Sequence, residues 1–248
     1  MQDVMDIKVT PLSPACGCAI EGVDLSQDLP DAVIDTIKAA WRKYLVIVVR
    51  GQTINQEQQL RFAARFGQLG ERKKASMTFA GRTQGIEQND SRVLLVSNKV
   101  VDGKPVGSFG DGDMWYHIDS GYSERPYKYT FLYGVELPST GGNTLFSNMY
   151  MAYDAVPAAL KEKLADRKAL HIHEYLRHDR VDLSKDLSGS PHWFHPVFVT
   201  HPETGRKSLF VDRLMTQRIE GVSAEESADI LEQLYEIGER KEFVYEHV

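Results

Sequence analysis

The chain has 248 residues, a formal net charge of −6 and a sequence pI of about 5.8. This acidic balance, with no dense Lys/Arg block, argues against a nucleic-acid partner. No apolar run approaches the roughly 18 residues that a membrane span needs, and the N-terminus lacks the pattern of a signal peptide. Two cysteines, Cys16 and Cys18, fit a reducing compartment, so we expect a cytoplasmic protein without a membrane partner.

The N-terminal elements mix helix and strand. Residues 6–12 predict a strand, and residues 45–51 predict a short apolar strand that ends at Gly51. Apolar residues at helical spacing predict a helix over residues 30–44. A second helix is expected over residues 55–66, with Asn55 as its N-cap.

After residue 90 the pattern favours strands. Residues 93–108 predict a hairpin with Asp102-Gly103 at its turn. The β-branched and aromatic run over residues 128–137 predicts another strand, and a glycine pair before Thr144 precedes a further one. Residues 151–167 read as helix broken at Pro157.

The last third combines strands with one long helix. A strand is expected over residues 168–175, with His171 and His173 on one face. Residues 177–192 are polar and irregular, as in a lid or mobile loop. Two strands should flank the Pro-Glu-Thr-Gly turn within residues 195–212, and Ser223 with Glu226 should form a capping box.

This element order favours one domain over residues 1–248, of α+β class and mainly β. The core we expect is a jelly roll (a double-stranded β-helix) with helical insertions. The order of elements alone does not distinguish a jelly roll from other α+β folds.

The stretch WYHIDSGY places His117 two residues before Asp119. On a strand, residues i and i+2 share a face, so the imidazole and the carboxylate would lie side by side. They would then supply two of the three ligands in the 2-His-1-carboxylate triad of non-haem Fe(II) oxygenases. The alternative is two polar residues on an ordinary strand, because this tripeptide is common.

Further blocks surround this motif along most of the chain. They are VTPLSPACGCAIEGVDLS, VIVVRGQTINQEQQLRFAARFGQLG, PSTGGNTLFSNMYMAYDAVP, HPVFVTHPETGRKSLFV and RIEGVSAEES. In order and approximate spacing they resemble the TauD/TfdA family of Fe(II)- and 2-oxoglutarate-dependent dioxygenases. The resemblance implies an oxidoreductase that uses Fe(II), 2-oxoglutarate and O₂, decarboxylating 2-oxoglutarate to succinate while a substrate is hydroxylated. It also implies a homo-oligomer.

The resemblance assigns roles to individual residues. His117 and Asp119 become iron ligands, and Thr144 becomes a ligand of a 2-oxoglutarate carboxylate; a plain strand residue is the alternative for Thr144. The implied substrate is a small organic acid of carboxylate, sulfonate, sulfate-ester or phenoxyalkanoate type. Asp113 and Tyr116 are candidate substrate-binding residues, and Asp113 disfavours taurine because taurine-specific members carry an amide there. Residues 168–192 could supply cations for an anionic substrate.

The family's third ligand, a histidine, and its 2-oxoglutarate-binding arginine are expected after Val248. None of the histidines downstream of Asp119 matches that position, and Arg206, Arg213 and Arg218 read as solvated surface residues. The downstream histidines are His171, His173, His178, His192, His195, His201 and His247. Three explanations are open for this expectation: a chain that is cut short, a natural truncation, or a degenerate relative. Two other functions therefore remain open: a catalytically inactive jelly-roll binding protein, and a metal enzyme of related fold that does not use 2-oxoglutarate.

Overall fold

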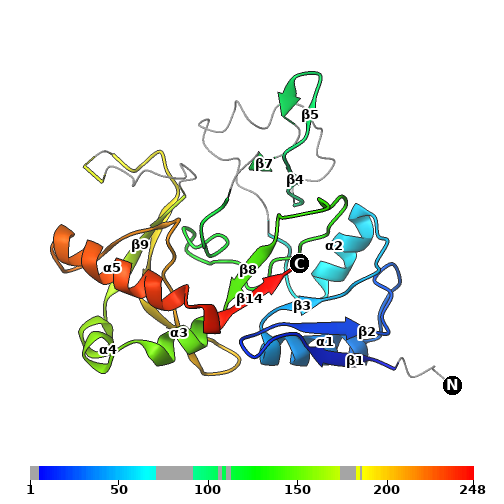
Figure 1. Cartoon of the computed structure of the whole chain (residues 1–248), viewed down its shortest axis with the longest axis horizontal. Coiled ribbons are helices and arrows are strands. Elements are labelled where there is room, and N and C mark those ends of the chain that lie inside the picture. Colours follow the sequence, from blue (N-terminus) through cyan, green and yellow to red (C-terminus); the bar gives the residue numbers. More distant parts are fainter. Residues whose placement is uncertain (1–5, 71–91, 106–107, 110–112, 174–182, 185) are drawn as a thin grey trace.

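A computed structural model describes residues 6–70, 92–105, 108–109, 113–173, 183–184 and 186–248 of the chain. Within these ranges the fold contains helices and short strands arranged around two hydrophobic cores (Figure 1). The α-helices are α1 Asp31–Tyr44, α2 Gln56–Ala64, α3 Met149–Ala155, α4 Ala158–Leu164 and α5 Ala224–Gly238. No described helix is both long enough and apolar enough to cross a membrane.

The first core lies in the N-terminal part, where α1 packs on a small sheet. Strands β1 (Lys8–Pro11) and β2 (Cys18–Glu21) pair antiparallel, and β3 (Ile47–Val48) runs parallel to β2. The predicted apolar face of α1 is buried, with Ile37 fully inaccessible. Asn55 and Gln58 form a reciprocal capping box that begins α2. Both N-terminal helices are therefore confirmed.

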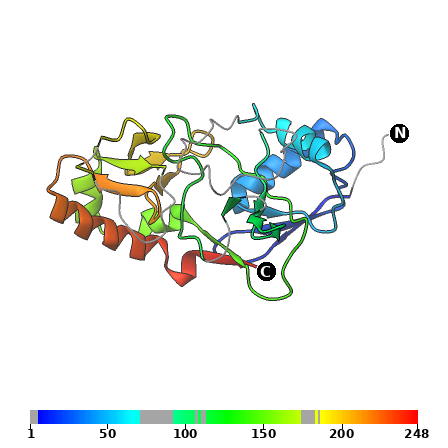
Figure 2. The ribbon, with the colours of Figure 1, turned by 90° about the horizontal axis from the view of Figure 1, so that it is seen from above.

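The second core lies between α3, α4, α5 and a three-stranded sheet. Strand β9 (Lys168–Ile172) is central and pairs antiparallel with β10 (His192–Pro196) and β13 (Thr216–Ile219). The predicted strands around the Pro-Glu-Thr-Gly turn are β11 (Phe198–Thr200) and β12 (Lys207–Leu209). Helix α5 lies along this core in Figures 1 and 2, and Leu234 on its inner face is fully buried.

A two-stranded ladder lies between the two cores. Strand β8 (Thr144–Ser147) pairs antiparallel with β14 (Val244–His247), which follows a 3₁₀ turn over Lys241–Phe243. The side-chain amide of Asn148 donates to the Ala15 carbonyl at 2.6 Å, tying this ladder to the N-terminal part. The aromatic ring of Tyr245 lies against Gly17, whose φ of +95° suits glycine.

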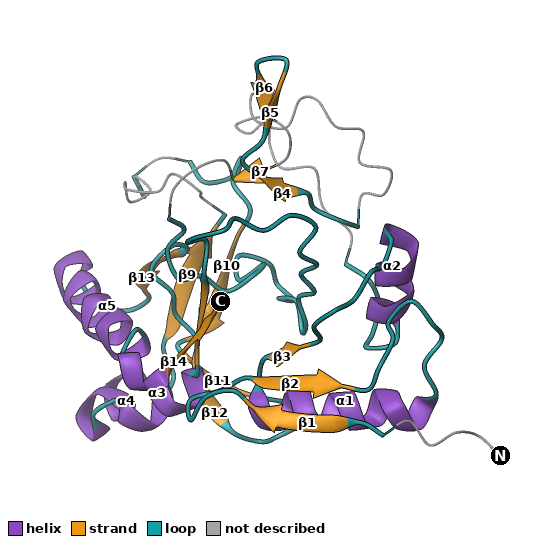
Figure 3. Ribbon diagram, turned by 45° about the vertical axis from the view of Figure 1, so that its right-hand side comes forward, coloured by secondary structure: helices purple, strands orange, loops and turns teal. Residues whose placement is uncertain are grey.

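The predicted hairpin projects from the rest of the fold (Figure 3). Strands β5 (Val100–Val101) and β6 (Lys104–Pro105) pair antiparallel around Asp102 and Gly103, which both have positive φ as a type I′ turn requires. At its base, β4 (Val96–Ser97) and β7 (Ser108–Phe109) pair in parallel.

Two sequence expectations about strands are wrong. Residues 128–137 belong to no described strand; Tyr129 and Phe131 instead pack their rings against Trp41 in the N-terminal core. Residues 113–118, which carry His117, also lie outside any described strand. An alternation of apolar and polar side chains in the sequence indicates an extended backbone. It does not indicate a neighbouring strand to which that backbone can hydrogen-bond, and a strand needs both. Within the predicted lid over residues 177–192, residues 177–182 and 185 lie outside the described residues.

Candidate metal site

The candidate site forms where an irregular segment enters a tight turn. Ser120 has a φ of +55°, and the Gly121 N–H donates to the Ile118 carbonyl at 2.9 Å. This turn brings Nε2 of His117 to 3.2 Å from Oδ1 of Asp119. The two predicted ligands are therefore brought together, although by a turn rather than by a strand. Their side chains are 29% and 45% exposed, so the pair is reachable from solvent.

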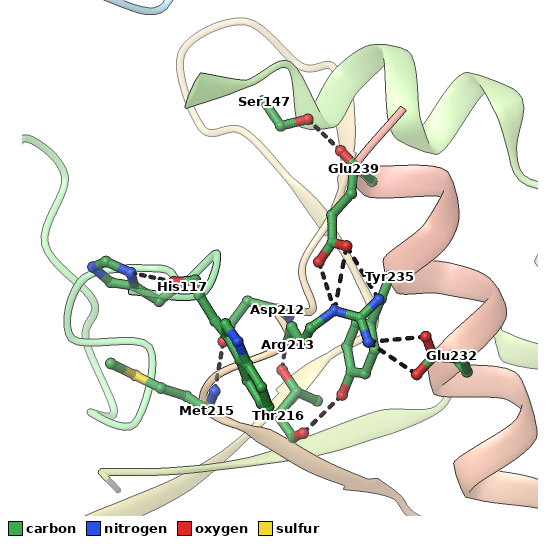
Figure 4. A network of polar contacts seen from close by, with 11 residues as sticks. His117, Ser147, Asp212, Arg213, Met215, Thr216, Glu232, Tyr235 and Glu239 are labelled. Atoms are coloured by element: carbon green, nitrogen blue, oxygen red, sulfur yellow. Dashed lines mark hydrogen bonds and ion pairs between the residues drawn. The ribbon is translucent and has the colours of Figure 1, made fainter. Parts of the chain in front are cut away.

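A second contact fixes the orientation of the imidazole. Nδ1 of His117 lies 3.0 Å from the Trp115 carbonyl oxygen, which can only accept a hydrogen bond (Figure 4). Nδ1 must therefore carry a proton, and Nε2 is the nitrogen that faces Asp119. Histidines that bind metals commonly donate their other N–H to a backbone carbonyl or carboxylate in this way.

The electrostatics of the pair show mutual stabilisation. Burial lowers the pKa of His117, but the hydrogen bonds to Asp119 and to the Trp115 carbonyl, with the charges of Asp119 and Asp212, outweigh it and raise that pKa overall. The hydrogen bond from His117 lowers the pKa of Asp119 below its ordinary value despite burial, and Thr130 contributes in the same direction. Each group thus favours the charged form of the other.

Residues of the C-terminal core hold this turn and the segment before it. The Leu214 N–H donates to the Tyr116 carbonyl at 3.2 Å. The ring nitrogen Nε2 of His195 donates to the Ser123 carbonyl at 2.8 Å. The Tyr122 ring makes an edge contact with His173, at 4.3 Å between centroids. The His117–Asp119 pair is therefore held on a packed sheet.

The other predicted site residues lie on different parts of the fold. Asp113 is exposed at the start of the segment that leads to His117. Tyr116 is partly buried; burial, followed by the charges of Glu239 and Glu246, raises the pKa of its hydroxyl. Thr144 begins β8 opposite His247 and is exposed.

A third ligand does not join the pair within the described part of the chain. No group of three or more His, Cys, Asp or Glu side chains there could hold a metal ion. His171 is fully buried, and His195 points its Nε2 at a backbone carbonyl. His178 lies outside the described residues.

The sequence interpretation of Arg213 as a solvated surface residue is wrong. Its side chain is only 22% exposed, and its guanidinium binds the carboxylates of both Glu239 and Glu232 (Figure 4). It also lies over the Tyr235 ring, whose hydroxyl donates to the Thr216 carbonyl at 2.8 Å. Sequence reasoning missed this role because the three partners of Arg213 lie on and just after α5, 19 to 26 residues further along the chain.

Comparison with known proteins gives consistent matches over nearly the whole chain. Residues 8–248 match the family described as "Taurine catabolism dioxygenase TauD, TfdA family". The chain is 30% identical to an alpha-ketoglutarate-dependent 2,4-dichlorophenoxyacetate dioxygenase of Cupriavidus pinatubonensis, covering 98% of this chain and 86% of that protein. It is 29% identical to pentalenolactone F synthase of Streptomyces arenae, covering 97% and 83%. Among solved structures, AAD-2 in complex with Mn(II) and N-oxalylglycine matches with a TM-score of 0.81 at 28% identity, covering 98% and 86%.

Proposed function

Because this chain belongs to the TauD/TfdA family of 2-oxoglutarate-dependent dioxygenases, we propose that His117 and Asp119 are two of its iron ligands. The protein is an oxidoreductase of the type that uses Fe(II), 2-oxoglutarate and O₂. When bound, the iron supplies the oxidising chemistry that consumes 2-oxoglutarate and O₂ and hydroxylates the substrate. What this chain contributes is a fixed pair of donor atoms, one nitrogen and one oxygen.

The observation that carries the proposal is the position of the two ring nitrogens of His117. With Nδ1–H donated to the Trp115 carbonyl, the lone pair of Nε2 faces Oδ1 of Asp119 at 3.2 Å. Two acceptors this close need a proton or a cation between them. A divalent cation satisfies both atoms at once, and imidazole with carboxylate is a donor set suited to Fe(II).

We propose Thr144 as the residue whose hydroxyl binds a carboxylate of 2-oxoglutarate. Its exposed position at the start of β8, after Gly141, Gly142 and Asn143, leaves the hydroxyl open to a ligand. The proposed substrate is a small organic acid, as the name of the 2,4-dichlorophenoxyacetate relative suggests. Asp113 and Tyr116 would contact it from the segment that leads to His117. Because the carboxylate of Asp113 disfavours an anionic group close to it, the acid group of the substrate would lie away from Asp113.

Several finer expectations remain proposals. We propose a jelly-roll core in a single domain over residues 1–248, a cytoplasmic location and a homo-oligomer, which light scattering of the purified protein would test. The third iron ligand and the 2-oxoglutarate-binding arginine are predicted to follow Val248. Reading the coding sequence past the codon for Val248 tests this directly: a histidine followed about a dozen residues later by an arginine is expected.

The proposed ligands can be tested by spectroscopy and turnover. Under anaerobic conditions, Fe(II) plus 2-oxoglutarate should give a weak visible charge-transfer band, and in air the protein should form succinate slowly without substrate. His117→Ala should abolish both signals. His192→Ala is the matched control, because Nδ1 of His192 makes the same contact with the carbonyl two residues before it, at 2.8 Å.

Two results would decide against the proposal. If 2-oxoglutarate turnover survives His117→Ala, the assignment of the metal ligands is wrong. If the full-length protein, including any residues encoded after Val248, gives neither the band nor succinate, the inactive binding protein becomes the better description. Loss of both signals in His192→Ala would trace the effect to general damage rather than to the metal site.

A further inference from the structure

A buried polar cluster lies directly behind the turn that carries Asp119. His171 and Thr216 are fully buried, and Asp212 is 5% exposed. Two atoms in the cluster, Nε2 of His171 and Oδ2 of Asp212, are buried without a hydrogen-bond partner among the described residues. Leaving such atoms unpaired costs free energy, so the arrangement calls for a functional explanation.

The contacts within the cluster determine where the His171 proton lies. Asp212 Oδ1 accepts from the Met215 N–H at 2.6 Å, and the Asp212 N–H donates to the Thr216 hydroxyl oxygen at 2.9 Å. Nδ1 of His171 lies 3.1 Å from that hydroxyl oxygen and 3.7 Å from Oδ2 of Asp212.

An ionised carboxylate oxygen in this interior requires a nearby N–H or O–H group. A proton on Nδ1 can be donated to the hydroxyl oxygen of Thr216 at 3.1 Å, and it also places positive charge density towards Oδ2 of Asp212, which at 3.7 Å is too far for a direct hydrogen bond. A proton on Nε2 instead would leave Oδ2 facing the lone pair of Nδ1. The Nδ1–H tautomer of neutral His171 is therefore favoured.

The same imidazole lies close to the metal-binding turn. A Cβ atom added to Gly121 would lie 3.6 Å from Nδ1 of His171 and 3.1 Å from the Ile118 carbonyl oxygen, so the turn sits closely on the ring. The His195 ring, which holds the Ser123 carbonyl, lies 5.5 Å from the His171 ring. Leu214, two residues after Asp212, holds the Tyr116 carbonyl.

We propose that Asp212 fixes His171 as its Nδ1–H tautomer, and that His171 so fixed is a positioning residue for the turn that presents Asp119 to the metal. His171 does not contact the metal; it acts through the backbone of residues 118–121. The effect on metal binding rests on the proposed ligand role of His117 and Asp119. The tautomer of His171 and its support of the turn do not rest on that ligand role, so both can be tested on metal-free protein.

The first test is ¹⁵N NMR of the histidine side chains in the full metal-free chain. His171 should show a protonated Nδ1 and an unprotonated Nε2. In Asp212→Asn the side-chain amide would donate to Nδ1, so the proton should move to Nε2, by the same logic as in Ser-His-Asp triads. A proton on Nε2 in the unchanged protein would overturn the proposal without any variant being needed.

The second test is amide hydrogen exchange at the turn. In Asp212→Asn, the amides of Gly121 and Ser123 should exchange roughly five- to tenfold faster relative to the Leu234 amide of α5. Ser227→Ala is the matched control: its hydroxyl is equally buried and accepts from the Ile219 N–H at 2.7 Å, away from the turn. It should leave that ratio unchanged. An unchanged ratio in Asp212→Asn would refute the positioning role.

The third test connects the cluster to metal binding. Fe(II) affinity, followed by the charge-transfer band with 2-oxoglutarate, should fall about tenfold in Asp212→Asn and stay constant in Ser227→Ala. If Asp212→Asn does not fold, Gly121→Ala perturbs the same turn directly, because the added Cβ would lie 3.1 Å from the Ile118 carbonyl oxygen and 3.6 Å from Nδ1 of His171. Full Fe(II) affinity in Gly121→Ala would then overturn the proposal. If the charge-transfer band is missing in every protein, while the tautomer of His171 and the exchange rates are as predicted, only the assignment of His117 and Asp119 as iron ligands is wrong.

Discussion

Replacing Arg213 by alanine should destabilise the protein by loosening the attachment of α5 to the turn behind the metal site. The Arg213 Nε and Nη2 atoms donate to Glu239 at 2.9–3.2 Å, and Nη1 donates to Glu232 at 2.8 and 3.0 Å. These two ion pairs raise the pKa of the guanidinium further, so it stays charged at every accessible pH.

The magnitude follows from the exposure of each partner. Glu239 is 26% exposed, so its paired hydrogen bonds with Arg213 should contribute about 2 kcal/mol. Glu232 is 52% exposed, and solvent screening reduces its contribution to about 0.5 kcal/mol. Stacking on Tyr235 adds about 0.5 kcal/mol, so Arg213→Ala should lower the free energy of unfolding by about 3 kcal/mol.

Urea unfolding of a double-mutant set measures these terms separately. The coupling between Arg213→Ala and Glu239→Gln should clearly exceed the coupling between Arg213→Ala and Glu232→Gln. Arg213→Lys should recover about half of the loss, because an ammonium cannot bind two carboxylates through a planar fork. Equal coupling energies for the two glutamates, or a loss below about 1 kcal/mol in Arg213→Ala, would refute this reasoning.

Two further predictions concern His195, which hydrogen-bonds to the metal-binding turn, and Leu234, which is buried on α5. Burial lowers the pKa of His195, so His195 takes up a proton at higher pH in the unfolded chain than in the folded protein. The stability that neutral His195 contributes is therefore fully present above about pH 6.5 and is lost as the pH falls towards the pKa of the folded state. His195→Gln, whose amide can still donate to the Ser123 carbonyl, should therefore lose less stability than the unchanged protein between about pH 7.5 and pH 5.5 in urea unfolding. Leu234→Ala should cost about 2–5 kcal/mol in the same assay, because Leu234 is fully buried, whereas Leu132→Ala, at a side chain 76% exposed, should change stability by less than about 0.5 kcal/mol.

Elements whose signals are local were predictable from the sequence. Helix α2 begins at the expected Asn55 cap, and α5 begins after Ser223, whose hydroxyl accepts from the Glu226 N–H. Only half of the predicted capping box at α5 is present, because the Glu226 carboxylate pairs with Lys163. A distant lysine thus displaced a local contact that sequence spacing alone would favour.

Features that depend on partners distant in sequence were not predictable. The run over residues 128–137 has the composition of a strand, yet its aromatic side chains serve the N-terminal core. The role of Arg213 depends on α5 returning to the turn after β12, a tertiary event without a local signature. The cluster of His171 and Asp212 joins residues 41 positions apart, the difference between the two residue numbers. No periodicity in the sequence encodes that contact.

The His117–Asp119 pair shows how a motif can be predicted correctly from the wrong local structure. Strand geometry was the reason to place the two side chains together, yet the pair forms at a turn in which Ser120 has positive φ. The i, i+2 spacing of His117 and Asp119 requires only that both side chains leave the backbone on the same side. Residues at the start of a turn can also meet this requirement. A turn alone would be a soft support for a metal. The hydrogen bonds from His195 and Leu214, together with the support that we propose for His171, supply the rigidity that a strand ladder would otherwise provide.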